Sequence, residues 1–130
     1  MSVPAGYVPY GGNSPFVRHA AQFHRREADG RRWVGCRIGV EQANSEGYAH
    51  GGFLAAFADF ALADTVMGIT LSLTIDYIRP ARLGDWIEAE IIERKRSASL
   101  VFADAMVCSG RCDLVRISGV FRPFVKRGPA

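Results

Sequence analysis

Apolar positions in the middle of the chain follow two different periods. Residues 53–63 are apolar at nearly every position and rich in alanine, which predicts a helix buried on all sides. Gly68 follows this helix and can cap its end. After Gly68 every second residue is apolar until Pro80, as expected of a strand with one face turned to the core. The core-facing residues of this strand are predicted to be Leu71, Leu73, Ile75 and Tyr77.

The remaining segments predict more strands and one short helix. Residues 1–15 are rich in glycine and proline, so we expect an irregular N-terminal arm, followed by a helix over residues 15–26. Four further strands are expected, at residues 32–40, 85–94, 99–108 and 114–124. Short connections between the last strands predict an antiparallel meander wrapped around the single buried helix. The expected fold class is α+β, in one domain spanning residues 1–130.

Composition agrees with one globular domain in a reducing compartment. The chain has 130 residues, of which 48% are hydrophobic, enough for a single core. Asp59 and Asp64 interrupt its most apolar stretch, so no membrane span is expected, and the N-terminus shows no signal peptide. A cytoplasmic location is therefore expected. The three cysteines are an odd set, expected to be free thiols, and without a second Cys/His pair they predict no metal site.

The charge of the chain permits a polyanionic partner without choosing one. A net charge of +3 and a pI near 9.0 suit nucleic acid, a membrane surface or the phosphates of a nucleotide-containing substrate. The basic clusters, such as Arg94-Lys95-Arg96, are short and have no interleaved aromatic residues. This argues against a dedicated nucleic-acid surface, and each cluster is also compatible with ordinary solvated surface.

Two features of the predicted helix carry candidate chemistry. Asp59 is a carboxylate among Ala and Phe residues, where it is desolvated unless it lies on a narrow polar stripe or caps a neighbouring loop. His50-Gly51-Gly52 precedes the helix, where free amides and the helix dipole favour negative charge. The two glycines let a substrate approach the backbone, whose N–H groups can hold an oxyanion. Alone, the tripeptide is equally compatible with a tight turn that contains a structural histidine.

The combined spacing resembles a known family. Residues 44–59, from Asn44 through His50-Gly51-Gly52 to Asp59, resemble the hotdog-fold acyl-CoA thioesterases of the phenylacetate-pathway (PaaI-like) type and the related 4-hydroxybenzoyl-CoA thioesterases. Residues 73–85 strengthen the resemblance, because this strand ends in an aromatic residue followed by Pro-Ala and a glycine. The similarity covers residues 34–124. It implies a five- or six-stranded antiparallel sheet around one long central helix, and hydrolysis of an acyl-CoA to a free acid and CoA.

The resemblance also implies roles for individual residues. Asp59 would be the general base or the nucleophile, and the Gly51 amide would polarise the thioester carbonyl, with Asn44 nearby. His50 would lie near the thioester or shape the loop. Thr70 falls where the family often places a Ser or Thr that orients the water or the carboxylate. By strand parity, however, Thr70 shares the outer face with Ser72, Thr74 and Asp76, and it reaches the site only if the chain bends between residues 68 and 70.

The expected partners follow from the same resemblance. It implies a homodimer with active sites at the interface, and members of the family commonly pair two dimers into a tetramer. No cofactor is expected, because CoA enters as part of the substrate. Basic side chains can bind the phosphates of CoA. The residues predicted to bind the substrate are Gly52, Arg94, Lys95, Arg96 and Ser99. Neither nucleic acid nor a membrane is expected as a partner.

Two alternatives remain open at this stage. One is a hotdog hydratase or dehydratase, which also handles acyl thioesters but typically uses a different His-centred pair. The other is a catalytically silent module that binds acyl-CoA. The set of Asn44, His50-Gly51-Gly52 and Asp59 favours hydrolysis. The sequence does not specify the acyl group, because the phenylalanines at helical spacing are more typical of a core.

Overall fold

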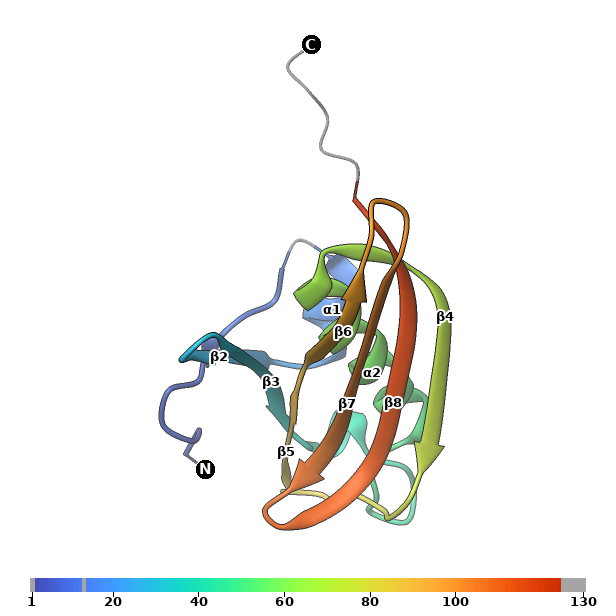
Figure 1. The fold of residues 1–130 in the computed structure, drawn as a ribbon. Helices are drawn as coiled ribbons and strands as arrows, with labels where there is room; N and C mark the ends of the chain where they lie inside the picture. The colour runs from blue at the N-terminus through green and yellow to red at the C-terminus, as the bar shows by residue number, and fades with distance from the viewer. Residues whose placement is uncertain (1, 13, 125–130) are drawn as a thin grey trace.

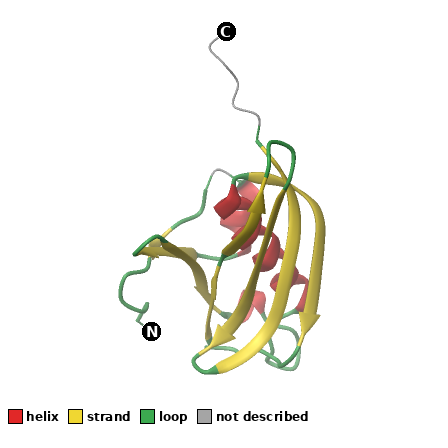
Figure 2. Cartoon of the chain, viewed as in Figure 1, coloured by secondary structure: helices red, strands yellow, loops and turns green. Residues whose placement is uncertain are grey.

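One antiparallel sheet curls around one long helix (Figures 1 and 2). The structure, a computed structural model, describes residues 2–12 and 14–124. The helices are α1 (Pro15–Ala20) and α2 (Gly51–Val66), with a short 3-10 turn, η1 (Val40–Gln42), before α2. The strands are β1 (Val8–Pro9), β2 (Phe23–Ala28), β3 (Arg31–Arg37), β4 (Gly68–Tyr77), β5 (Trp86–Glu90), β6 (Ile92–Arg96), β7 (Val101–Ser109) and β8 (Cys112–Pro123). Their order across the sheet is β1-β2-β3-β5-β7-β8-β4, and β6 also pairs with β7.

The central helix is largely enclosed by the sheet, although it is not buried on every side as its composition predicts. Seven residues of α2 are buried, and they pack mainly against β4, β7 and β8. Its alanines keep the helix thin, so the strands approach it closely. The α+β hotdog expectation is confirmed, although the sheet has eight strands rather than five or six. The additional strands are β1, β2 and the division of one expected strand into β5 and β6, where Ile91 N–H turns aside to the carbonyl of Arg32, 2.9 Å away.

The helix expected over residues 15–26 is wrong beyond Ala20. The chain instead enters β2, which pairs with β3 in a hairpin whose turn is Asp29-Gly30. Both turn residues have positive φ, 53° and 74°, the conformation of the two-residue turn that matches the twist of paired strands. The conformation of these two turn residues therefore favours a hairpin, and not a helix, in this part of the chain. Of the N-terminal arm, residues 2–12 contain only the two-residue strand β1, and Met1 and Asn13 lie outside the described residues.

Gly68 does not cap α2. The C-cap is Met67, in the left-handed conformation with φ 59°, and its N–H donates to the carbonyl of Ala63. Gly68 is the first residue of β4 and is buried against β8. A Cβ there would lie 3.0 Å from the Arg122 carbonyl oxygen and from the Phe121 Cβ. The absence of a side chain at Gly68 therefore lets β4 and β8 approach each other closely, and it has no part in ending the helix.

Strand β4 contains a bulge that changes which residues face the helix. Its register with β8 moves from Thr70↔Phe121 directly to Ser72↔Val120, so Leu71 is the extra residue. Leu71 is 51% exposed, and its expected place on the core face is wrong. The same shift turns Thr70 toward the helix side, with Leu73 and Ile75. The predicted alternation of core-facing and outward-facing residues therefore applies only to the part of β4 after the bulge.

Strand β4 also forms an open edge of the sheet. Within the described residues it pairs only with β8, so one side of a ten-residue strand keeps free backbone groups. Exposed apolar side chains accompany this edge, at Met67, Ile69, Leu71 and Tyr77. Among residues 2–12 and 14–124, no helix has the length and apolarity needed to span a membrane.

Candidate active site

The structure brings Thr70 to Asp59. The Thr70 hydroxyl donates to Asp59 Oδ1 over 2.5 Å, joining the start of β4 to the middle of α2. Both residues are half-buried. Within the described part of the chain, Asp59 Oδ2 accepts no hydrogen bond, so one oxygen is oriented by Thr70 and the other is available to a water or a substrate. The bulge at Leu71 makes this contact possible.

The three residues His50-Gly51-Gly52 form the start of α2, and each has a different role there. His50 is the N-cap, and its Nδ1 accepts the N–H of Gly52 over 2.8 Å. His50 therefore shapes the start of the helix and occupies the Gly52 amide, one of the two donors that the glycines offer. The N–H of Gly51 has no hydrogen-bond acceptor among residues 2–12 and 14–124. Gly51 is exposed, so a substrate oxygen can reach this amide.

Asn44 organises the loop before the helix. Its Oδ1 accepts the N–H groups of Glu46 and Tyr48, at 2.9 and 3.1 Å. These bonds close the turn that leads to His50. Asn44 is exposed and forms no hydrogen bond with Asp59, so the structure places it as an organiser of the loop.

Gln42 supports the same loop and was not among the predicted site residues. It is buried, its Nε2 donates to the Ala20 carbonyl over 2.7 Å, and its own carbonyl accepts the N–H of His50 over 2.8 Å. Gln42 thus ties the end of α1 to the N-cap of α2. A buried glutamine just before the motif is a possible signal, but the polar composition of residues 41–46 conceals it.

Asp64 has a structural partner in the N-terminal arm. The Tyr10 hydroxyl donates to Asp64 Oδ2 over 2.5 Å, and this bond raises the pKa of Tyr10. Tyr10 also stacks on Phe60, with ring centroids 5.9 Å apart. Asp64 therefore anchors the arm to α2, on a different side of the helix from Asp59.

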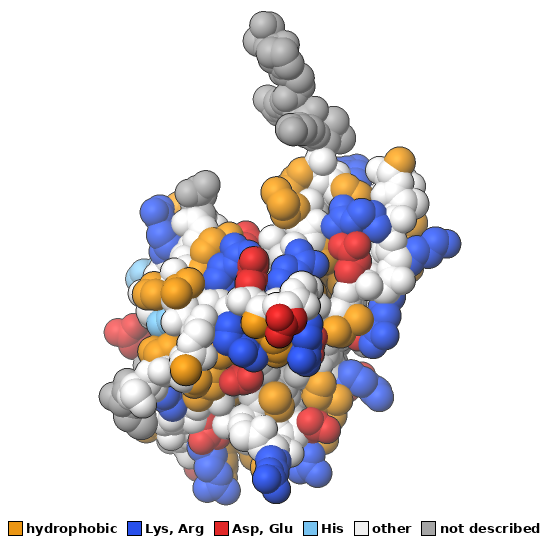
Figure 3. Space-filling view, turned by 60° about the vertical axis from the view of Figure 1, so that its left-hand side comes forward, with side chains coloured by type: hydrophobic (Ala, Val, Ile, Leu, Met, Phe, Trp, Pro, Cys, Tyr) orange, Lys and Arg blue, Asp and Glu red, His pale blue; other side chains and the backbone are white. Residues whose placement is uncertain are grey.

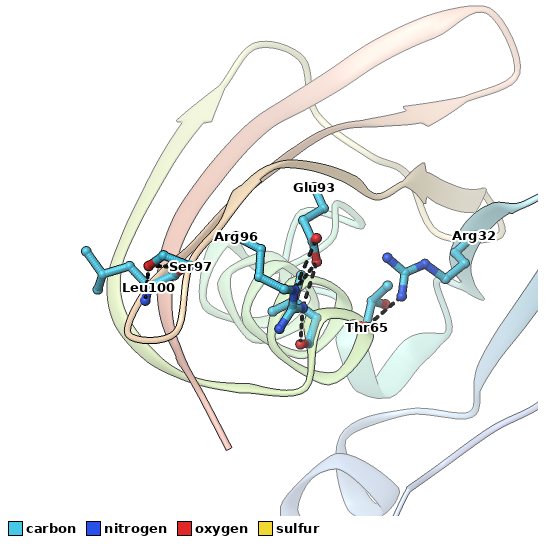
Figure 4. A network of polar contacts seen from close by, with 7 residues as sticks. Arg32, Thr65, Glu93, Arg96, Ser97 and Leu100 are labelled. Atoms are coloured by element: carbon cyan, nitrogen blue, oxygen red, sulfur yellow. Dashed lines mark hydrogen bonds and ion pairs between the residues drawn. The ribbon is translucent and has the colours of Figure 1, made fainter. Parts of the chain in front are cut away.

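Most of the basic segment is already engaged in intramolecular contacts. Arg94 forms an ion pair with Asp104 at 2.8 Å. Arg96 bonds Glu93 at 2.7 Å and donates to the carbonyl of Val66, the last residue of α2, at 2.8 Å (Figure 4). Arg32 similarly reaches the carbonyl of Thr65 at 2.9 Å. Two guanidinium groups thus cap the C-terminus of the helix, where cations are favoured.

Lys95 and Ser99 are differently placed. Lys95 is exposed, forms no ion pair within the described residues, and lines a hollow of about 480 Å³ on the outer face of the sheet with Phe102. Ser99 is exposed in the β6–β7 turn. Ser97 orders this turn by accepting the N–H groups of Ser99 and Leu100, and Figure 4 shows Ser97 beside Leu100. Of the predicted substrate-binding cations, Lys95 is the one without a carboxylate partner among the described residues.

Charge on the face drawn in Figure 3 is mixed. Lys and Arg side chains lie beside Asp and Glu side chains there and do not gather into one basic patch. No group of three or more His, Cys, Asp or Glu side chains within the described residues is arranged to hold a metal ion. The chemistry available to the site is that of a carboxylate, a hydroxyl and a helix N-terminal amide.

Gly51 and Asp59 of one chain cannot serve the same carbonyl. They are eight residues apart on a continuous helix, which separates them by about 12 Å along its axis. A reacting atom has to lie about 3 to 3.5 Å from each group that acts on it. Both functions can act together only if a second copy of the chain supplies one of them.

The fold and site define a class of enzyme. The family model of the thioesterase superfamily matches residues 46–115, and the chain belongs to this superfamily of thioester hydrolases. It is 32% identical to a Pseudomonas aeruginosa protein provisionally assigned as an esterase, over 93% of this chain and 97% of that protein.

Solved structures agree with this assignment. A mutant of the phenylacetic acid degradation protein PaaI from Thermus thermophilus is 29% identical, with a TM-score of 0.72, over 84% of this chain and 99% of that chain. A thioesterase-type protein from Streptococcus pneumoniae, solved with coenzyme A, shares the fold at 18% identity and a TM-score of 0.71, over 82% of this chain and 92% of its own. The expected hotdog-fold, PaaI-like membership is confirmed.

Replacing Arg96 with alanine should lower the free energy of unfolding by about 1 kcal/mol, because the half-exposed guanidinium stabilises the C-terminus of α2. Arg96 holds the pKa of Glu93 below its ordinary value, so part of this stabilisation is present at neutral pH and is lost as the pH falls through the folded-state pKa of Glu93. Urea unfolding measures the effect. Lys95→Ala is the matched control, and equal stabilities of the two variants would contradict the capping role.

Proposed function

We propose that the chain hydrolyses an acyl-CoA thioester at a site shared by two copies of itself. The observation that carries the proposal is the oriented carboxylate of Asp59, with one oxygen bonded to Thr70 and the other available. Asp59 of one copy acts as general base or nucleophile. Gly51 of the partner copy donates its N–H to the carbonyl oxygen. The coenzyme A in the Streptococcus pneumoniae structure is consistent with a CoA substrate on this fold.

The general-base route uses each group once. Asp59 Oδ2 takes a proton from water, and the hydroxide attacks the thioester carbon. The carbonyl oxygen becomes an oxyanion, which the Gly51 N–H and the N-terminal dipole of α2 stabilise. The intermediate then expels the CoA thiolate, which recovers the proton from Asp59. In the nucleophilic route, Asp59 instead attacks the carbonyl carbon and expels the CoA thiolate, which leaves an acyl anhydride. Water then hydrolyses the anhydride to the free acid and the Asp59 carboxylate, and the proton released goes to the thiolate.

The proposed dimer forms along the open edge of β4. This edge combines unpaired backbone groups with exposed apolar side chains, a combination suited to pairing with a second copy. Thr70 lies on the same strand and Asp59 on the helix beside it. Pairing at β4 therefore brings the candidate groups of two copies toward one seam.

Asp59→Asn should reduce thiol release from acyl-CoA by about 10²-fold to 10⁴-fold, because it removes the base but keeps the shape of the side chain. The change is measured as the rate of free-thiol release in a screen of aryl, phenylacetyl, short-chain and long-chain acyl-CoAs. Asp64→Asn is the matched control on the same helix and should retain turnover. Binding without turnover by the unmodified protein would favour a silent acyl-CoA-binding module instead.

Two variants that each lose most of their activity should restore it when mixed. Gly51→Pro removes the N–H donor and puts the ring Cδ in its place. The helix should persist, because proline is favoured at the first position of a helix and the extended His50 before it is compatible. A heterodimer of Gly51→Pro with Asp59→Asn contains one intact site, so random reassociation should recover about a quarter of the wild-type rate. Denaturing and refolding the two proteins together, against each alone, tests this. Activity of either variant alone, or none in the mixture, would contradict the shared site.

Lys95→Ala should raise the KM for acyl-CoA by about threefold to tenfold and leave kcat unchanged, because Lys95 is proposed to bind a CoA phosphate. The acyl-pantetheine analogue lacks the nucleotide and serves as the internal control. Its KM should not change. Equal effects on both substrates would place the phosphates elsewhere.

A further inference from the structure

Tyr77 holds the peptide next to the proposed oxyanion donor. Its hydroxyl donates to the carbonyl oxygen of Gly51 over 2.7 Å. The other end of the same peptide group is the N–H of Gly52, which donates to His50 Nδ1 over 2.8 Å. The peptide between Gly51 and Gly52 is therefore fixed at both ends by side chains from outside the helical hydrogen-bond pattern.

The preceding peptide is also held, but its donor stays free. The carbonyl of His50 accepts the N–H of Leu54 over 3.0 Å, and the N–H of His50 donates to Gln42 over 2.8 Å. The remaining group is the N–H of Gly51, which has no acceptor among residues 2–12 and 14–124. Because both adjacent peptides are fixed, this N–H has a defined direction before a substrate arrives. A preoriented donor stabilises an oxyanion without the cost of reorganising it.

Tyr77 reaches this position from β4. It is the last residue of the strand whose Thr70, near the other end, bonds Asp59. Its ring lies 3.8 Å from the place where a Cβ of Gly51 would be. Tyr77 and Gly51 also share the lining of a cavity of about 280 Å³, together with Leu54 and Ile78. One strand therefore contacts both of the helix positions to which the proposed function assigns chemistry.

We infer that Tyr77 is a positioning residue for the Gly51 oxyanion donor, acting through its hydrogen bond to the Gly51 carbonyl. This inference rests on the proposed function. Tyr77 exchanges no proton with the substrate, and its ring limits the freedom of the helix N-terminus beside the cavity. Its hydroxyl matters most when charge develops on the carbonyl oxygen. Loss of the hydroxyl should therefore lower kcat rather than weaken substrate binding.

Tyr77→Phe tests the inference, because it removes one oxygen and keeps the ring. With the best acyl-CoA from the screen, kcat should fall about tenfold, less than for loss of the donor itself, while KM stays within about twofold. The pH profile of kcat should keep its shape, since Asp59 and Thr70 are unchanged. Tyr48→Phe is the matched control, because no hydrogen bond of its hydroxyl occurs among the described residues, and it should retain wild-type kcat.

The outcomes separate this inference from the proposed function. If Asp59→Asn is inactive and Tyr77→Phe retains full kcat, the positioning role is overturned and the proposed function stands. A loss that appears equally in KM shows a merely structural bond and also overturns the role. If Tyr77→Phe loses activity on folding grounds, combining it with Gly51→Pro decides the matter. With the donor already absent, the positioning role predicts no further loss in kcat. If the unmodified protein hydrolyses no acyl-CoA, both ideas fall.

Discussion

Burial of an apolar, alanine-rich helix inside a single curled sheet imposes the main constraint on this molecule. A helix with seven buried residues leaves few positions for polar groups, and those positions lie where the sheet does not close over it. One opening is at the N-terminus, where Gly51 is exposed, and another is beside β4, where Asp59 meets Thr70. The candidate site residues lie at these two openings.

Strand β4 links these openings to each other and to the edge of the sheet. Its residues contact Asp59 through Thr70 and Gly51 through Tyr77. Its outer edge remains unpaired within the described residues. A partner that pairs there would therefore border the active groups directly. In the proposed dimer, assembly and chemistry would be coupled through this one strand.

Much of this was predictable from the sequence, because periodicity and composition act locally. The buried helix, the strand after it and the candidate pair of Gly51 and Asp59 all follow from short patterns. The β2 strand was missed because the two turn residues Asp29 and Gly30 set up a hairpin, which the pattern of residues 15–26 does not reveal. Strand parity alone put Thr70 on the outer face, because parity assumes an unbroken ladder, and one extra residue at Leu71 reverses it. The roles of Gln42, Tyr10 and Tyr77 depend on contacts between distant segments, which no local pattern contains.

The arginines at the end of α2 have an electrostatic consequence for its beginning. A helix carries opposite partial charges at its two ends, and their fields partly cancel at a distance. Here the guanidinium groups of Arg32 and Arg96 lie against the last carbonyls and neutralise the negative end. Among the described residues, the positive end at Gly51 has no corresponding carboxylate bonded to it. The helix therefore acts as a one-ended source of positive potential, directed toward the place where an anion would form.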